Sequence, residues 1–178
     1  MRAFVALDLP EEVRQRLNLL SFLLPLPRRV PPGNYHITLA FLGEIGDGLA
    51  EEVHHALGAL RAPGFALTLA GAGLFGGAQA RVAYAAVASE PLLAHLARKV
   101  ETAARRAGAP PETRRFVPHV TLGRFRPGEA DAARLERAVA EHQGFTAGPF
   151  AVREFVFYRS HLTAEGADYE ELARYPLG

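Results

Sequence analysis

Apolar and polar positions along the chain follow two different periods, which predict strands and helices in turn. Apolar and β-branched runs bounded by Gly or Pro predict strands over residues 2–9, 35–43, 65–75, 81–89, 116–125, 150–162 and 167–177. Apolar residues spaced three and four apart predict helices over residues 11–23, 48–61, 91–108 and 130–142. The resulting order, βαβα followed by ββαβαββ, indicates an α+β fold with two similar lobes.

Two of the predicted strands carry the same four-residue pattern. Residues 36–39 read HITL and residues 119–122 read HVTL, 83 positions apart. Because strand side chains alternate between faces, the His and Thr of each pattern share one face and the two apolar residues share the other. The apolar pair can pack beneath helices. Two such strands facing each other across a groove would offer two imidazoles and two hydroxyls.

Those side chains suit displacement at phosphorus. Histidine titrates near neutrality, so one ring of a pair can be a neutral base while the other is a charged acid. Threonine hydroxyls can donate hydrogen bonds to phosphate oxygens without a metal. A lone His in a strand is more often structural, and Thr is a common strand residue, but the repetition favours function. The symmetry of the pattern leaves open which histidine is the acid.

Length and composition limit the class of protein. The 178 residues suit one two-lobed domain over 1–178. There is no cysteine, which excludes disulfides, a thiol nucleophile and Cys-ligated metal sites. No apolar run is long enough to span a bilayer, and MRAFVALDLP is typical of a strand rather than of a signal peptide. We therefore expect a cytoplasmic protein without a membrane partner.

The charge is small overall but uneven. The net charge is +1, whereas residues 98–126 carry eight Arg or Lys against two Glu, a net +6. Such a stretch suits an anionic ligand. Solvated helix faces are the alternative explanation.

The remaining histidines do not suggest a metal site. His54 and His55 are adjacent and point to different sides of a helix, and no H-x-x-x-H or His/Asp cluster occurs. We predict no metal. His161 is the one other histidine of interest, because its strand is expected near the groove. Ser160 lacks a neighbouring base, and the absence of a P-loop argues against an ATP-dependent ligase.

The chain resembles the two-histidine phosphoesterases, and among them the RNA 2′,3′-cyclic phosphodiesterases, which are also called LigT-like proteins or 2′-5′ RNA ligases. The matching segments are RAFVALDLP, NYHITLAFLGEI, FVPHVTLGRFR and the tail FVFYRSHLTAEGADYEEL. The resemblance implies a bilobal α+β fold with pseudo-two-fold symmetry. Each lobe is expected to hold an antiparallel sheet with helices outside, and a cleft is expected between the lobes.

The same resemblance implies a function and roles for residues. It implies hydrolysis of an RNA or nucleotide 2′,3′-cyclic phosphate to a 2′-phosphate, without metal or other cofactor. Separately, we expect a monomer. His36 would be the proton donor and His119 the proton acceptor, while Thr38 and Thr121 would bind the phosphate. Two other functions stay open, which are ATP-independent 2′-5′ RNA ligation at the same site and a non-catalytic module that binds RNA ends.

Three more residues have two interpretations each. Archaeal relatives place an Arg five residues after the second His, in or near the cleft, and Arg124 occupies that position, so the resemblance makes it a third candidate for binding the phosphate. Strict strand alternation puts Arg124 on the face opposite His119, unless Gly123 allows a bulge. Tyr35 and Phe116 flank the motifs; they could stack on a base, but we favour a core role for both.

Overall fold

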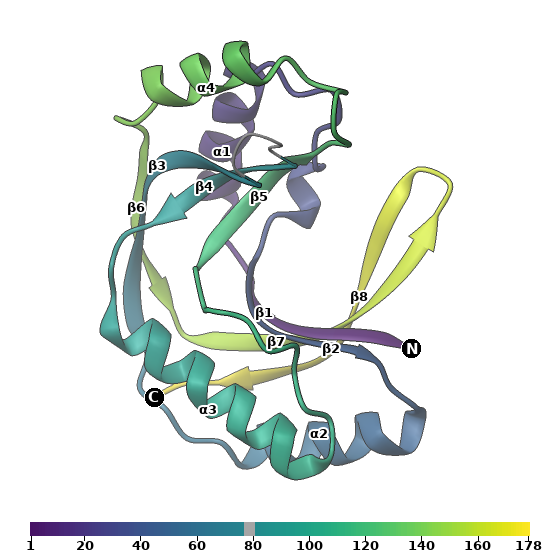
Figure 1. Cartoon of the computed structure of the whole chain (residues 1–178). Coiled ribbons are helices and arrows are strands. Elements are labelled where there is room, and N and C mark those ends of the chain that lie inside the picture. The colour runs from purple at the N-terminus through teal and green to yellow at the C-terminus, as the bar shows by residue number, and fades with distance from the viewer. Residues whose placement is uncertain (77–80) are drawn as a thin grey trace.

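The structure is a computed structural model that describes residues 1–76 and 81–178, and these form two four-stranded antiparallel sheets (Figure 1). The first sheet has the order β2-β1-β7-β8, with bounds Ile37–Glu44, Arg2–Leu7, Glu154–Thr163 and Gly166–Pro176. The second sheet has the order β5-β4-β3-β6, with bounds His119–Arg124, Val82–Val87, Phe65–Phe75 and Thr146–Val152.

The predicted helices form close to their expected ends. They are α1 (Glu11–Leu23), α2 (Asp47–Ala59), α3 (Pro91–Ala107) and α4 (Ala132–Glu141). The sequence provides local start and stop signals for α3: the Glu90 carboxylate accepts from the Leu92 N–H, and Gly108 ends the helix at a φ of 100°. Among the described residues, no helix is long and apolar enough to cross a membrane.

Two of the helices pack on the sheet of the other lobe. α1 follows β1 of the first sheet, yet it packs against β5 and β6 of the second. α3 follows β4 of the second sheet, yet it packs against β2 and α2 on the first. The first lobe therefore consists of the first sheet with α2 and α3, and the second lobe of the second sheet with α1 and α4 (Figure 1).

The two lobes place the motif-bearing strands in corresponding positions. In each sheet the motif-bearing strand lies at one edge and pairs with a strand that precedes it in the sequence, β2 with β1 and β5 with β4. The strands β2 and β5 also contact each other across the boundary between the lobes. The predicted α+β fold with two similar lobes is confirmed, although each lobe combines distant segments of the chain.

The apolar core lies between each sheet and its helices. In the first lobe Ile37 and the α3 residues Leu96 and Val100 are fully buried, and in the second lobe Val120 and Leu135 are equally buried. The apolar residue that follows each motif histidine thus points into a core. The opposite face of each motif strand is left for the His and Thr.

One predicted strand was wrong. Residues 150–162 are not continuous, because the chain leaves β6 at Val152 and enters β7 at Glu154, in the other sheet. Two consecutive exposed residues, Arg153 and Glu154, interrupt the alternation at the break, and the sequence interpretation did not use this signal. β6 also begins earlier than predicted, at Thr146, and contains Pro149. Its edge position explains why a proline is tolerated there.

Candidate functional site

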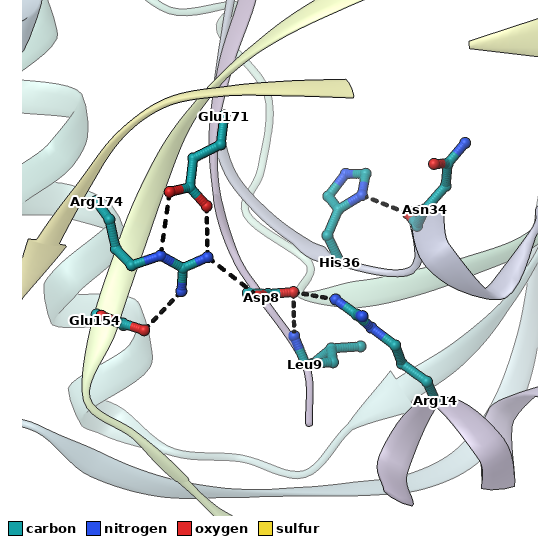
Figure 2. Close-up of polar contacts among 8 residues, drawn as sticks. All are labelled: Asp8, Leu9, Arg14, Asn34, His36, Glu154, Glu171 and Arg174. Carbon is teal, nitrogen blue, oxygen red and sulfur yellow. Dashed lines mark hydrogen bonds and ion pairs between the residues drawn. The ribbon is translucent and has the colours of Figure 1, made fainter. Parts of the chain in front are cut away.

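The first motif histidine is anchored at one ring nitrogen. The Nδ1 of His36 lies 2.8 Å from the carbonyl oxygen of Asn34 (Figure 2). A carbonyl only accepts, so Nδ1 carries the hydrogen and Nε2 carries the lone pair. Nε2 lies 3.0 Å from the Thr38 hydroxyl, which can donate to it. His and Thr of the motif therefore meet directly, as their shared face predicts.

The second motif histidine has the same anchor. The Nδ1 of His119 lies 2.8 Å from the carbonyl oxygen of Val117, again two residues earlier in the chain. The same argument places the hydrogen on Nδ1 and leaves the Nε2 lone pair available. Both rings thus present a basic nitrogen of the same kind.

Aromatic side chains hold the His36 ring from two sides. Its centroid lies 5.0 Å from that of Phe4, and 5.3 Å from that of Tyr169 in an edge-on arrangement. Phe4 is buried and also stacks on Tyr158 at 5.2 Å. Such contacts restrict the ring to one orientation.

A second aromatic pair holds the His119 ring. Its centroid lies 4.8 Å from Phe75 and 5.6 Å from Tyr84, both edge-on, and these two rings stack on each other at 4.1 Å. The Tyr84 ring lies directly over Gly73, where an added Cβ would be 2.3 Å from the Tyr84 hydroxyl oxygen. The sequence interpretation missed these aromatic residues. The single Tyr in the alanine-rich segment RVAYAAVAS was the signal available for Tyr84.

The bulge that the sequence left open is present in β5. Thr121 pairs with Tyr84 and Gly123 pairs with Ala83, so Leu122 is an extra residue on β5. The bulge reverses the alternation, and Arg124 shares the face of His119 and Thr121. The expectation from strict alternation, which placed Arg124 on the opposite face, is therefore wrong.

Gly123 is required by a close approach of the chain. An added Cβ would lie 2.7 Å from the carbonyl oxygen of Arg28. The segment after α1 runs along the outer edge of β5 here: Arg29 bridges to Gly123, and the Val30 N–H donates to the Leu122 carbonyl at 2.9 Å. This support fixes the bulge and, with it, the position of Arg124.

Electrostatics link the histidines and Arg124. The pKa of His36 is lowered to about 4, mainly by burial and also by the charges of Arg124 and His119, against the opposing effects of the Asn34 carbonyl and Asp8. Burial likewise lowers the pKa of His119, with contributions from Arg124 and Arg114 in the same direction. In the free protein at pH 7 the His36 ring is therefore neutral.

Asp8 belongs to an ion-pair network beside His36 (Figure 2). It accepts from the Leu9 N–H at 3.0 Å and pairs with Arg14 and, at 3.3 Å, with Arg174. Arg174 also pairs with Glu154 at 2.6 Å and Glu171 at 2.5 Å. The network joins β1, α1, β7 and β8 close to the first motif.

A cavity connects the two motifs. Its volume is about 400 Å³, and Thr38 and His119 both line it. It continues from them between β2, α3 and the segment before β5. Its other lining side chains include Phe41, Arg98, Arg114, Arg115 and Phe116.

The other sequence expectations have separate outcomes. Tyr35 is 2% exposed, which confirms its core role. Phe116 is half-buried; it packs on the core but also lines the cavity, so a core role describes only part of its surroundings. His161 pairs with Glu170 at 2.7 Å on the β7–β8 hairpin. Within residues 1–76 and 81–178, no group of three or more His, Asp or Glu could hold a metal ion.

Known proteins with full-length similarity were found. A relative from Escherichia coli K12, named RNA 2′,3′-cyclic phosphodiesterase, is 34% identical over 99% of this chain and 96% of its own length. A relative of the same name from Geobacillus stearothermophilus is 33% identical over 98% of this chain, which spans 56% of that protein. The crystal structure of apo E. coli LigT superposes with a TM-score of 0.82 at 32% identity, covering 99% of this chain and 96% of LigT. E. coli LigT complexed with 3′-AMP gives a TM-score of 0.80.

A family model provides the assignment. The model described as 2′-5′ RNA ligase superfamily matches residues 8–164, a range that includes both motifs, Arg124 and every described strand except β1 and β8. The chain belongs to the 2′-5′ RNA ligase superfamily.

Proposed function

We propose that this protein hydrolyses the 2′,3′-cyclic phosphate at the end of an RNA, or of a nucleotide, to a 2′-phosphate. The observation that carries the proposal is the pair of anchored imidazoles. Both rings donate Nδ1–H to a backbone carbonyl, and the charge of Arg124 acts on both. Nε2 carries the lone pair in both rings, and in His36 it is paired with the Thr38 hydroxyl at 3.0 Å. The names of the full-length relatives support the same substrate class.

In the proposed reaction, His119 and His36 act on opposite oxygens of the phosphate. The Nε2 of His119 accepts a proton from water as the water oxygen forms a bond to phosphorus. The bond from phosphorus to the 3′ oxygen breaks, and Nε2–H of His36 donates a proton to that oxygen. The products are a 2′-phosphate and a 3′ hydroxyl. A proton then returns from His119 to His36 through solvent, which restores the starting state.

The charged and hydroxyl groups would bind the phosphate. Thr38 and Thr121 share the faces of the two histidines, so their hydroxyls can donate to the non-bridging oxygens. Arg124 would balance the negative charge that develops on those oxygens. No metal or other cofactor is needed for these steps.

The low pKa of His36 sets a requirement on the substrate. A ring that is neutral at pH 7 must gain a proton before it can act as an acid. The bound phosphate supplies the necessary field, because an anion beside an imidazole raises its pKa. Binding of the substrate would thus favour protonation of His36, the acid of the reaction.

We further propose that residues 1–178 act as one domain and as a cytoplasmic monomer, with cyclic-phosphate ends of RNA or cyclic nucleotides as partners. The candidate site is assembled from both lobes of one chain. A second copy is therefore not needed to complete it.

Product analysis tests the proposal. A short RNA with a 2′,3′-cyclic phosphate is incubated in excess EDTA with the wild type, His36→Ala, His119→Ala and the control His55→Ala, an exposed histidine on α2. We expect a 2′-phosphate from the wild type and the control, and a fall of about 10²–10⁴-fold in each motif variant. A 3′-phosphate, or an end that stays closed, would contradict the mechanism. Joining of two RNA ends would instead favour ligation.

A further inference from the structure

A second surface of the first lobe carries positive charge that has no role in the proposed reaction. An open groove of about 690 Å³ is lined by residues of α2, α3 and the segment after α2. These two helices lie side by side on the first lobe (Figure 1). Four of the groove's lining side chains are Arg or Lys, and none of its described lining residues is acidic. These four side chains are Arg61, Arg98, Lys99 and Arg106, and we call this surface the basic groove.

The basic groove adjoins the cavity between the motifs. Arg98 lines both of them. On α3, Ala94, Ala97 and Glu101 face the cavity, whereas Lys99 and other residues one step around the helix face the groove. Arg98 therefore stands on the ridge of α3 that separates the two hollows. A chain leaving the phosphate site over this ridge would enter the groove directly.

The positive charge in the groove is only partly neutralised by neighbours. The two acids that line the neighbouring cavity are paired with other cations, Glu101 with Arg105 at 2.5 Å and Glu112 with Arg114. Lys99 donates to the backbone carbonyl of Arg61 at 2.5 Å, which fixes its position but leaves its charge. Oriented cations with no carboxylate among them are suited to an anionic partner.

The spacing of the cations fits a nucleic-acid backbone. At about 1.5 Å rise per helical residue, Arg98 and Arg106 are about 12 Å apart along α3. At about 3.4 Å per step of a stacked strand, this span corresponds to three or four phosphates. The groove is thus long enough to contact several successive nucleotides.

We propose that the basic groove binds the phosphodiester backbone of single-stranded RNA upstream of the reacting end. The path runs from the phosphate site across Arg98 into the groove between α2 and α3. This inference rests on the proposed function, because it takes the cyclic end of an RNA to occupy the site between the motifs. Binding in the groove makes the enzyme selective for oligonucleotides over cyclic mononucleotides, because it raises their affinity and leaves the chemical step unchanged.

Two charge-matched triple variants test the path. The groove variant combines Arg61→Gln, Lys99→Gln and Arg106→Gln. The control variant combines Arg134→Gln, Arg137→Gln and Arg153→Gln, which are exposed residues outside both the cavity and the groove. Fluorescence anisotropy measures binding of a 12-nucleotide RNA ending in a 2′-phosphate, and of a dinucleotide with the same end, from 50 to 300 mM NaCl. Hydrolysis of a 2′,3′-cyclic mononucleotide is measured in parallel.

The expected results separate the groove from the catalytic site. For the groove variant, the Kd of the 12-nucleotide RNA should rise about tenfold at 150 mM salt. The slope of log affinity against log salt should fall by about 2, at roughly 0.7 for each phosphate that is no longer neutralised by the protein. Dinucleotide binding and mononucleotide hydrolysis should stay within twofold of the wild type. The control variant should match the wild type throughout.

Several results would overturn the proposal. The first is that the two triple variants weaken binding of the long RNA equally. The second is that the wild type binds the 12-nucleotide RNA no more tightly than the dinucleotide. The third is that the groove variant also slows mononucleotide hydrolysis. If the wild type opens no cyclic phosphate, the proposed function fails. The anisotropy comparison still decides whether the groove binds RNA.

Discussion

Replacing Gly73 by Ala should disturb the second histidine from a distance. An added Cβ would lie 2.3 Å from the hydroxyl oxygen of Tyr84 and 2.4 Å from its Cζ, far inside van der Waals contact. The Tyr84 ring must then move, but it is stacked on Phe75 at 4.1 Å and contacts the edge of His119. The substitution therefore forces a choice between strain and the loss of these aromatic contacts.

The size of the effect follows from overpacking. Inserting a methyl group into a packed site costs about 1–3 kcal/mol. For a chain of this length that corresponds to a fall of roughly 2–12 °C in Tm. A displacement of His119 by about 1 Å would lower kcat by about 10²-fold, because the reacting nitrogen would leave its position.

A double-mutant cycle measures the effect. Gly73→Ala, Tyr84→Ala and the double variant are compared in thermal unfolding and in hydrolysis of a cyclic mononucleotide. With the ring removed, the added methyl group meets no obstacle. The double variant should thus be no less stable than Tyr84→Ala, which gives a coupling energy of about 1–3 kcal/mol. Gly58→Ala, at a helical position with open space, is the control and should keep its activity.

Either of two results would refute the reasoning. If Gly73→Ala keeps both Tm and kcat of the wild type, Tyr84 is free to move and does not position His119. If the two substitutions have additive effects on stability, the contact between them carries no energy.

Three further predictions concern the motif and its surroundings. Thr121→Val keeps the strand shape and removes the hydroxyl, so kcat should fall by about tenfold or more; unchanged kcat would make Thr121 only a strand residue. Because the pKa of free His36 is about 4 and a bound anion raises it, binding of sulfate, whose own charge does not change between pH 5 and 7, should take up a proton at pH 7 and should strengthen as the pH falls toward 5. Calorimetry in two buffers of different ionisation enthalpy measures this uptake, and a value of zero would contradict the charging of His36. Arg174→Gln leaves Asp8, Glu154 and Glu171 without their shared cation and should cost about 1–2 kcal/mol in urea unfolding at low salt. The difference should shrink in 1 M NaCl, and a difference independent of salt would point to packing instead.

Much of the fold was predictable because its elements have strong local signals. Alternating apolar residues marked the strands, and the acidic and proline starts marked the helices. The lobe to which each helix belongs was not predictable in this way. That choice depends on packing between residues far apart in the chain, such as α1 with β6.

The candidate site was likewise predictable only in part. His36, Thr38, His119 and Thr121 could be proposed from one repeated pattern, since strand alternation fixes their shared faces. The position of Arg124 could not, because it depends on a one-residue bulge that the neighbouring segment supports at Gly123. The aromatic rings around both histidines come from other strands, so no local pattern connects them to the motifs.

The exchange of helices between the lobes has a consequence for how the protein folds. Residues 2–6 pair with residues 156–160, far away in the sequence, and α1 packs on the second sheet although it follows a strand of the first. Neither sheet can be completed on the ribosome until β6, β7 and β8 have emerged. High contact order of this kind slows folding, and a fragment cut between the two motifs would contain no complete lobe. The two halves of the candidate site are therefore acquired together, in one cooperative step, rather than one lobe after the other.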